Sequence, residues 1–250
     1  MKIHGDIKSG NCLKVKWTAD ALGLSYAWVP VDIMTGESRT AAYLAKFPQA
    51  QVPAIELDDG RTLAQSNAII RYLARGSRLL PDDAFTQAKI DEWLFWEQYS
   101  HEPYVGTCRF HMVYLGKSKE TRDPAKVERG EKALDHMERM LAAASRAALT
   151  APSPLVGEGR GGGESVLSRS DRPHLLPQSQ TSASGIPPHP NPPPQEGREL
   201  DRFLVGQSLT IADIALLAYT RVAHEGGFEM SARPNVRKWI ARCESALEIS

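Results

Sequence analysis

The stretch Ser9-Gly10-Asn11-Cys12-Leu13-Lys14-Val15 stands between a predicted strand, residues 2–6, and a predicted helix. Gly23 follows where a helix C-terminus favours glycine, and apolar residues recur before it at helical spacing, at Cys12, Val15, Ala19 and Leu22. In such a unit the first N–H groups and the dipole of the helix can stabilise a negative charge, a thiolate included. The turn that begins at Ser9 is therefore a candidate for chemistry.

Strand and helix signals continue to alternate through the first eighty residues. The predicted elements are a strand at 26–31, a short helix at 40–46, a hairpin of 54–57 with 62–63 around Gly60, and a helix through 69–73 that Ser66 can cap. The order is βαβαββα. It predicts an α/β, thioredoxin-like domain over residues 1–78, in which the turn at Ser9 occupies the place of a Cys-x-x-Cys pair.

Strand signals disappear after Pro81, and the second half predicts an all-helical bundle over residues 85–250. A long helical region spans 85–112 with a kink at Pro103, and Val127 to Ala144 carries one apolar face. Thr210 and Asp213 have the spacing of a capping box ahead of an apolar helix, which predicts a role in folding. A last helix is expected at 236–246.

Residues 151–198 differ from the rest of the chain. They contain 10 Pro, 7 Gly and 7 Ser among 48 residues, and no Phe, Trp or Tyr. Such a composition cannot bury enough apolar surface to offset the entropy of ordering it. We favour a disordered insert within the helical domain over a recognition tail for a polyproline-binding partner.

Composition excludes several classes of function. Lys plus Arg and Asp plus Glu are each 30, so the chain has no basic field for nucleic acid or an anionic membrane. The first residues lack the apolar core of a secretory signal, and no run approaches the ~20 apolar residues of a membrane span. Three scattered cysteines suggest neither a disulfide framework nor a metal site. We expect a cytoplasmic protein without a metal.

Three local features converge on one ligand. A serine hydroxyl at Ser9 is a poor nucleophile without an adjacent base, but it is a good donor to the thiolate of a ligand, and Asn11 could donate in its place. The alternative for Ser9 is an ordinary helix N-cap. In Gln51-Val52-Pro53-Ala54 the proline precedes a strand and is expected in the cis form. Gln65-Ser66 opens a helix whose N-terminus suits a carboxylate.

These stretches resemble bacterial glutathione transferases of the theta-like or nu-like, Ser-x-x-Cys type. The resemblance covers nearly the whole chain outside the insert. It is carried by the turn at Ser9, Gln51-Val52-Pro53-Ala54-Ile55, Gln65-Ser66-Asn67-Ala68-Ile69-Ile70-Arg71-Tyr72-Leu73, Phe203-Leu204-Val205-Gly206 and Leu209-Thr210-Ile211-Ala212-Asp213-Ile214-Ala215. It implies a homodimeric enzyme that activates the thiol of glutathione, its co-substrate, for attack on a small electrophile.

The same resemblance assigns roles to individual residues. Ser9 would activate the thiol, and Val52, held by cis-Pro53, would pair with the cysteinyl main chain of glutathione. The γ-glutamyl end would be held by Gln65 and Ser66, and the glycine carboxylate by Gln51 and Arg39.

Two departures from the family pattern leave alternatives open. The family usually has Glu where this chain has Gln65, and the insert interrupts the second domain. One alternative is a glutathione- or partner-binding protein that no longer turns over. The other is a glutathione-dependent disulfide reductase that uses Cys12, although Cys12 lies on the apolar face of its helix and is better explained as a buried small hydrophobe.

Overall fold

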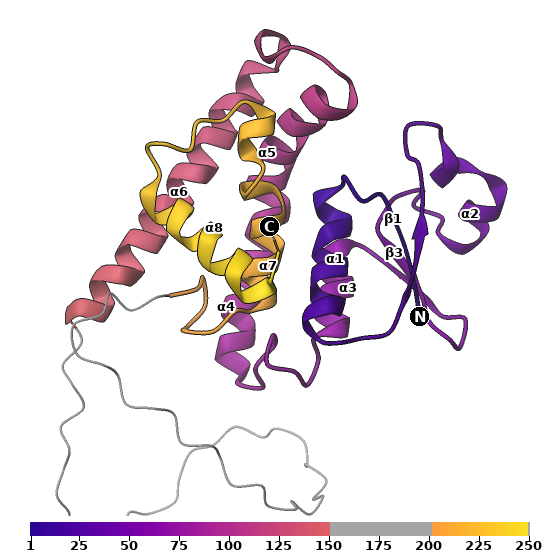
Figure 1. Cartoon of the computed structure of the whole chain (residues 1–250), viewed down its shortest axis with the longest axis horizontal. Coiled ribbons are helices and arrows are strands. Elements are labelled where there is room, and N and C mark those ends of the chain that lie inside the picture. The colour runs from indigo at the N-terminus through magenta and orange to yellow at the C-terminus, as the bar shows by residue number, and fades with distance from the viewer. Residues whose placement is uncertain (151–201, 250) are drawn as a thin grey trace, which may run out of the picture.

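The structure is a computed structural model that describes residues 1–150 and 202–249, with side chains described outside 144–201. The predicted insert, 151–198, lies outside the described residues. Figure 1 shows two parts, a small domain built on a sheet and a larger domain of helices. The division agrees with the predicted fold class.

The first domain has the predicted βαβαββα order. Its elements are β1 (Lys2–Gly5), α1 (Gly10–Ala21), β2 (Ala27–Pro30), the 3₁₀ turn η1 (Glu37–Arg39), α2 (Ala41–Lys46), β3 (Ala54–Glu56), β4 (Thr62–Ala64) and α3 (Ser66–Leu73). The strand order is β2-β1-β3-β4, with β1 parallel to β2 and antiparallel to β3. Ile3 is paired with Trp28 on one side and Ile55 on the other.

The second domain is helical throughout its described residues. It comprises α4 (Ala84–Trp96), η2 (Glu97–His101), α5 (Glu102–Arg109), η3 (Phe110–Tyr114), η4 (Lys119–Thr121), α6 (Pro124–Thr150), α7 (Ile211–Thr220), η5 (Ala223–Gly226) and α8 (Pro234–Leu247). At the predicted kink, the π-helical turn η2 precedes Pro103. Proline cannot donate to the carbonyl four residues earlier and its ring clashes with it, so a wider turn accommodates the residue.

Helices α1 and α3 lie between the sheet and the helical domain (Figure 1). One apolar core continues from the sheet through α1 and α3 into α7, every residue of which is buried. Ile3, Val15, Ile69 and Leu217 are members of this core. The two domains therefore share a packed interface, and that interface fixes where the helical domain meets the N-terminus of α1.

Asp213 anchors the start of α7. Thr210 and Asp213 form the predicted capping box, in which Asp213 Oδ2 accepts from the Thr210 N–H at 3.0 Å. The other carboxylate oxygen accepts from the Leu204 N–H at 2.8 Å and from Trp239 Nε1 at 2.9 Å. Burial raises the pKa of Asp213, and these donors oppose the shift. The side chain thus joins three segments, and its role in folding stays a prediction.

Polar contacts also cross the interface between the domains. Lys14 Nζ of α1 lies 2.8 Å from Glu97 Oε1 of η2, and both side chains are fully buried. In the helical domain, His101 Nε2 lies 3.0 Å from the hydroxyl of Thr220.

Among the described residues, no helix has both the length and the apolar character of a membrane span.

Candidate functional site

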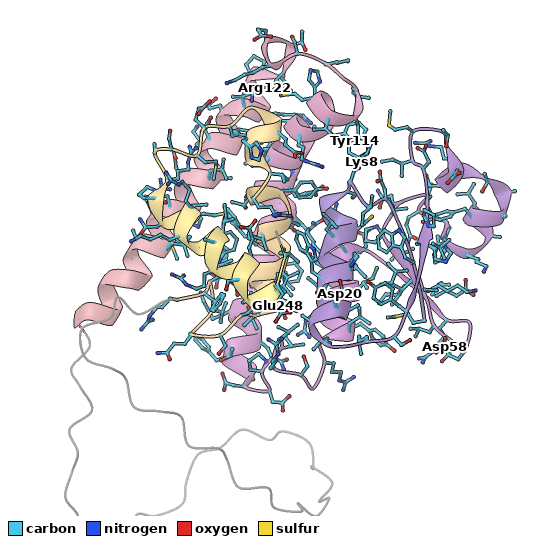
Figure 2. All side chains as sticks on the ribbon, in the orientation of Figure 1. Lys8, Asp20, Asp58, Tyr114, Arg122 and Glu248 are labelled. Atoms are coloured by element: carbon cyan, nitrogen blue, oxygen red, sulfur yellow. The ribbon has the colours of Figure 1, made fainter. Side chains whose placement is uncertain are left out.

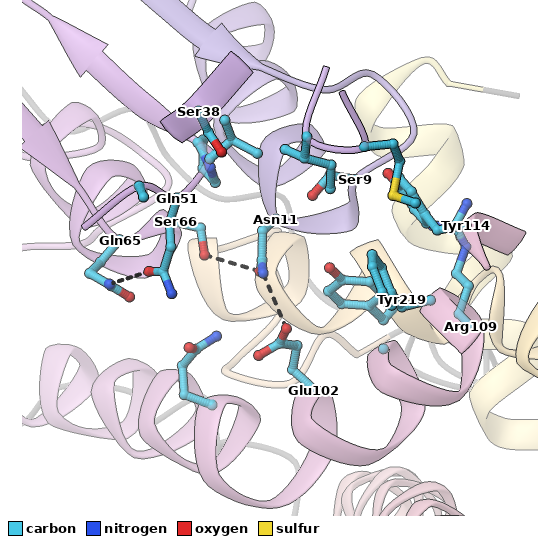
Figure 3. A pocket seen from close by; sticks show the side chains of 18 of the residues that line it. Ser9, Asn11, Ser38, Gln51, Gln65, Ser66, Glu102, Arg109, Tyr114 and Tyr219 are labelled. Atoms are coloured by element: carbon cyan, nitrogen blue, oxygen red, sulfur yellow. Dashed lines mark hydrogen bonds between the residues drawn. The ribbon is translucent and has the colours of Figure 1, made fainter. Parts of the chain in front are cut away.

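A cavity of about 540 Å³ lies where the loops of the first domain meet α5, η3 and α7. It brings together every residue predicted for the site (Figure 3). These residues are Ser9, Asn11, Arg39, Gln51, Val52, Pro53, Gln65 and Ser66. Residues separated by most of the first domain in sequence therefore share one surface.

The N-terminus of α1 opens into this cavity. Ser9 occupies the N-cap position with extended backbone, yet its side chain makes no capping hydrogen bond. Its hydroxyl instead lies near Cys12 and Tyr219 and acts to lower the pKa of both side chains. The ordinary capping role considered for Ser9 is therefore not the one its side chain adopts.

Asn11 is held on both ends of its amide. Its Oδ1 accepts from the Ser66 hydroxyl and its Nδ2 donates to Glu102 Oε1, each at 3.2 Å (Figure 3). Because the ionised carboxylate of Glu102 can only accept, the amide nitrogen of Asn11 must face it, and the amide oxygen then accepts from the Ser66 hydroxyl. Asn11 Nδ2 carries a second N–H besides the one donated to Glu102, and the residue lines the cavity.

Glu102 supplies negative charge to this site. It is the only acidic residue among those described as lining the cavity. Burial raises its pKa, and the Coulombic attraction of Lys14 opposes that shift. His101 and Glu102 precede Pro103 at the kink. His101 is fully buried within the helical domain, whereas Glu102 is partly buried and lines the cavity.

The start of α3 differs from the expected cap. Gln65, not Ser66, is the N-cap of α3, and it makes no side-chain capping bond. Ser66 is the first helical residue, and its hydroxyl is used by Asn11. Gln65 has φ of 70°, a left-handed conformation that is uncommon for non-glycine residues and is often found at functional sites. Its Nε2 donates to Gln51 Oε1 at 3.2 Å.

The Val52–Pro53 peptide bond is cis, as predicted. Val52 and Pro53 line the cavity beside Gln51, and Arg39 reaches it from η1. Gln51 and Arg39 are both exposed, so their polar groups are available to a ligand.

Residues of the helical domain complete the site, and sequence reasoning missed most of them. Tyr219 of α7 lies against the first turn of α1, and Tyr114 of η3 donates to Asp6 Oδ2 at 2.8 Å. Arg109 also lines the cavity, and it contacts Glu225 at 2.6 Å and the Lys8 carbonyl at 2.7 Å. Figure 2 shows Lys8 and Tyr114 at the boundary between the domains. No local pattern in the sequence marks Tyr219 or Tyr114 as facing this boundary.

An apolar wall extends the cavity on the side of Tyr114. Met34 and Phe110 line the cavity and are exposed. A neighbouring hollow of about 420 Å³ shares Met34 and Tyr114 with it and adds the exposed Ile7 and Val113. Exposed apolar side chains beside a polar cavity provide a surface for an apolar group of a ligand.

Cys12 lies below the turn and away from the cavity. Its side chain is fully buried, and its sulfur accepts from the Asp6 N–H at 3.4 Å. Burial raises the pKa of the thiol to about 11. The residue behaves as the buried small hydrophobe that its helical position predicts.

A thioredoxin-like domain, packed on a helical domain with a polar cavity between them, thus defines the class of this protein. Two family descriptions match the chain: "Glutathione S-transferase, N-terminal domain" over residues 9–75, and "Glutathione S-transferase, C-terminal domain" over residues 196–246. The solved structure of a glutathione S-transferase from Pseudomonas fluorescens Pf-5 is 36% identical, with a TM-score of 0.71, and the match covers 98% of this chain and 94% of that one. The chain belongs to the glutathione S-transferase family.

Curated relatives match over part of their length. The glutathione S-transferase-like protein LUC7 of a Fusarium species is 33% identical over 147 residues, which are 56% of this chain and 65% of that protein. Protein URE2 of Eremothecium gossypii is 28% identical over 240 residues, 92% of this chain and 60% of that protein. The chain thus spans less than two thirds of the length of these relatives. The structure of Ure2p in complex with glutathione has the same fold, with a TM-score of 0.72 at 21% identity.

Proposed function

We propose that this protein is a glutathione transferase that binds glutathione in the cavity and activates its thiol for attack on a small electrophile. The observation that carries the proposal is the convergence of Ser9, Asn11, Val52 and Ser66 on one cavity at the N-termini of α1 and α3. Family membership supplies the identity of the ligand. The arrangement supports a theta-like or nu-like subtype with the Ser-x-x-Cys turn.

Binding follows from the polar groups on the cavity wall. The N-terminus of α3, with Ser66, suits the γ-glutamyl carboxylate, because helix N-termini attract anions. Glu102 brings to the cavity the carboxylate that Gln65 does not provide. Arg39 and Gln51 lie where the glycine carboxylate would be held, and Val52 would pair with the cysteinyl main chain.

The chemistry requires a thiolate. A hydrogen bond to a charged group contributes ~1.5–3 kcal/mol, which lowers a thiol pKa by about one to two units. Ser9 and Asn11, together with the dipole of α1, supply such stabilisation where the sulfur would lie. The thiol releases its proton to water, and the thiolate then forms a bond to the electrophilic carbon as the leaving group departs, which is chloride in a chloronitroaromatic. Met34, Phe110 and Val113 hold the apolar part of the acceptor nearby.

The test compares Ser9→Ala with Asn11→Ala in conjugation of a chloronitroaromatic acceptor across pH. Ser9→Ala should reduce turnover about ten- to a hundredfold at neutral pH while glutathione affinity changes little. The deficit should shrink as pH rises, because hydroxide then ionises the thiol without help. If Ser9→Ala matches the parent while Asn11→Ala collapses, activation belongs to Asn11. If the parent itself neither binds glutathione nor turns over, the proposed function is wrong.

We further propose a cytoplasmic homodimer. Phe95 and Tyr99 are 74% and 82% exposed, and Tyr72 of α3 is also exposed. Of their aromatic neighbours in the same helical region, Trp93 is buried and Trp96 is partly buried against the core. Large exposed aromatic side chains suit an interface. Light scattering that finds only a monomer at micromolar concentration would contradict the dimer.

A glutathione-binding protein without turnover is the second candidate, and Gln65 supports it. The amide has no charge for the ligand's ammonium and is engaged with Gln51. In that case, immobilised glutathione would retain the protein although no acceptor is conjugated. The disulfide reductase has less support, because the thiol of Cys12 is buried and its pKa is raised to about 11.

A further inference from the structure

Tyr219 lies unusually close to the first turn of α1. A Cβ built at Gly10 would lie 2.8 Å from Cε1 and from Cζ of the Tyr219 ring, and one at Gly106 would lie 3.2 Å from Cε1. Two glycines, one from each domain, thus leave room for the ring. Because Cζ carries the hydroxyl, the phenol oxygen is placed at the N-terminus of α1.

The hydroxyl of Tyr219 has polar neighbours there. The Ser9 side chain and the Asn11 backbone lie close enough to the phenol to lower its pKa, and all three residues line the cavity. Figure 3 shows the phenol directed toward Asn11. The charged groups around the ring are Glu102 of α5, Glu97 of η2 and Lys14, whose Nζ lies 5.8 Å from the ring centroid. Burial raises the pKa of Tyr219, so the phenol stays protonated at neutral pH.

We propose that Tyr219 is a positioning residue for Ser9, whose oxygen accepts the phenol proton while Ser9 directs its own proton to the sulfur of the ligand. This role rests on the proposed function. Without a ligand, the Ser9 hydroxyl can turn among Tyr219 and Cys12, since hydroxyl protons rotate freely. A bound thiolate is a stronger acceptor than either neighbour and takes the Ser9 proton.

When the Ser9 proton points to the sulfur, a lone pair of Ser9 Oγ is free to accept the hydroxyl proton of Tyr219. The Asn11 backbone acts to lower the pKa of the phenol, and a more acidic phenol is a better donor to Ser9. The result is a chain from the Asn11 backbone through Tyr219 and Ser9 to the sulfur. The helical domain therefore takes part in thiol activation through α7, although Tyr219 itself does not contact the sulfur.

The experiment titrates the thiol of bound glutathione by its thiolate absorbance in the parent, Tyr219→Phe, Ser9→Ala and the double variant. Phenylalanine keeps the ring between Gly10 and Gly106, so the packing survives while the hydroxyl is lost. Tyr219→Phe should raise the thiol pKa by about half a unit to one unit, a three- to tenfold loss of thiolate at neutral pH. When Ser9 is already replaced by alanine, Tyr219→Phe should not change the thiol pKa any further.

A matched control is Tyr104→Phe on α5. The Tyr104 hydroxyl accepts from Arg129 outside the cavity, so its loss should leave the thiol pKa unchanged. An unchanged thiol pKa in Tyr219→Phe would overturn the proposal. The proposal would also be overturned if Tyr219→Phe shifted the thiol pKa equally with and without Ser9, because Tyr219 would then be an independent donor. A parent that binds no glutathione would overturn the proposed function, and the role of Tyr219 with it. Ionisation that depends on Ser9 but not on Tyr219 would overturn the role alone.

Discussion

Gly10 shows how one residue can connect the two domains. It is the first residue of α1, it is buried, and its missing side chain is the space that the Tyr219 ring occupies. Glycine is needed at this position because the Tyr219 ring approaches the backbone closely, and any Cβ would prevent that approach. A positive φ is not the reason, because Gly10 does not have one. The residue that follows Ser9 therefore decides whether α7 can reach the site.

Gly10→Ala should destabilise the protein and impair thiol activation together. The added Cβ would lie 2.8 Å from the buried ring, and overpacking of this kind costs about 1–3 kcal/mol. Urea denaturation and the thiol titration measure the two effects. Combining it with Tyr219→Leu, which removes the ring, should restore stability but not the thiol pKa. If Gly10→Ala is as stable as the parent, the close approach is not a real constraint.

The buried pair Lys14–Glu97 connects α1 to η2. Glu97 also accepts from Asn67 at 3.0 Å and from Gln98 at 2.8 Å, so its charge is surrounded by donors from three elements. A buried ion pair adds little over apolar groups of the same shape, but breaking it leaves a charge without a partner. This pair therefore specifies how α1 sits against η2 more than it stabilises the fold.

Lys14→Met or Glu97→Gln alone should lower the free energy of unfolding by about 3–5 kcal/mol, because each leaves one buried charge. The double variant removes both charges and should be more stable than either single variant. Urea denaturation of all four proteins gives the coupling energy. Losses that simply add would mean that the two side chains do not depend on each other, which would contradict the buried contact.

Across the whole molecule, the sequence predicted local structure better than contacts between domains. The βαβαββα order followed from alternation and turn residues, and the α7 cap followed from the Thr210–Asp213 spacing. Ser9 and Ser66 belong to motifs within one domain, so their shared cavity was predictable. Tyr219 and Glu102 reach the site through helix packing, which one sequence does not encode in any short pattern. Residues 151–198 lie outside the described residues, so their predicted disorder stays a prediction.

The stability of the whole molecule should fall as the solution is acidified below neutral pH, and His101 should be a main cause. Burial lowers the pKa of His101 to about 4, against about 6.5 for an exposed imidazole. Between these values the unfolded chain binds a proton that the folded protein does not, so stability is full above pH 6.5 and is lost as pH falls toward 4.

From pH 7 to pH 5 this single group accounts for about 2 kcal/mol, since each unit of pKa difference is equivalent to about 1.4 kcal/mol. Urea denaturation at both pH values should therefore show that the free energy of unfolding falls less between pH 7 and pH 5 in His101→Gln than in the parent. The pKa of His4 and that of His136 are also lowered by burial, but both residues remain in the variant, so the difference isolates His101. His224→Gln, at an exposed position, controls for the loss of an imidazole and should follow the parent. If His101→Gln loses as much stability as the parent, the buried imidazole is not the acid-sensitive group.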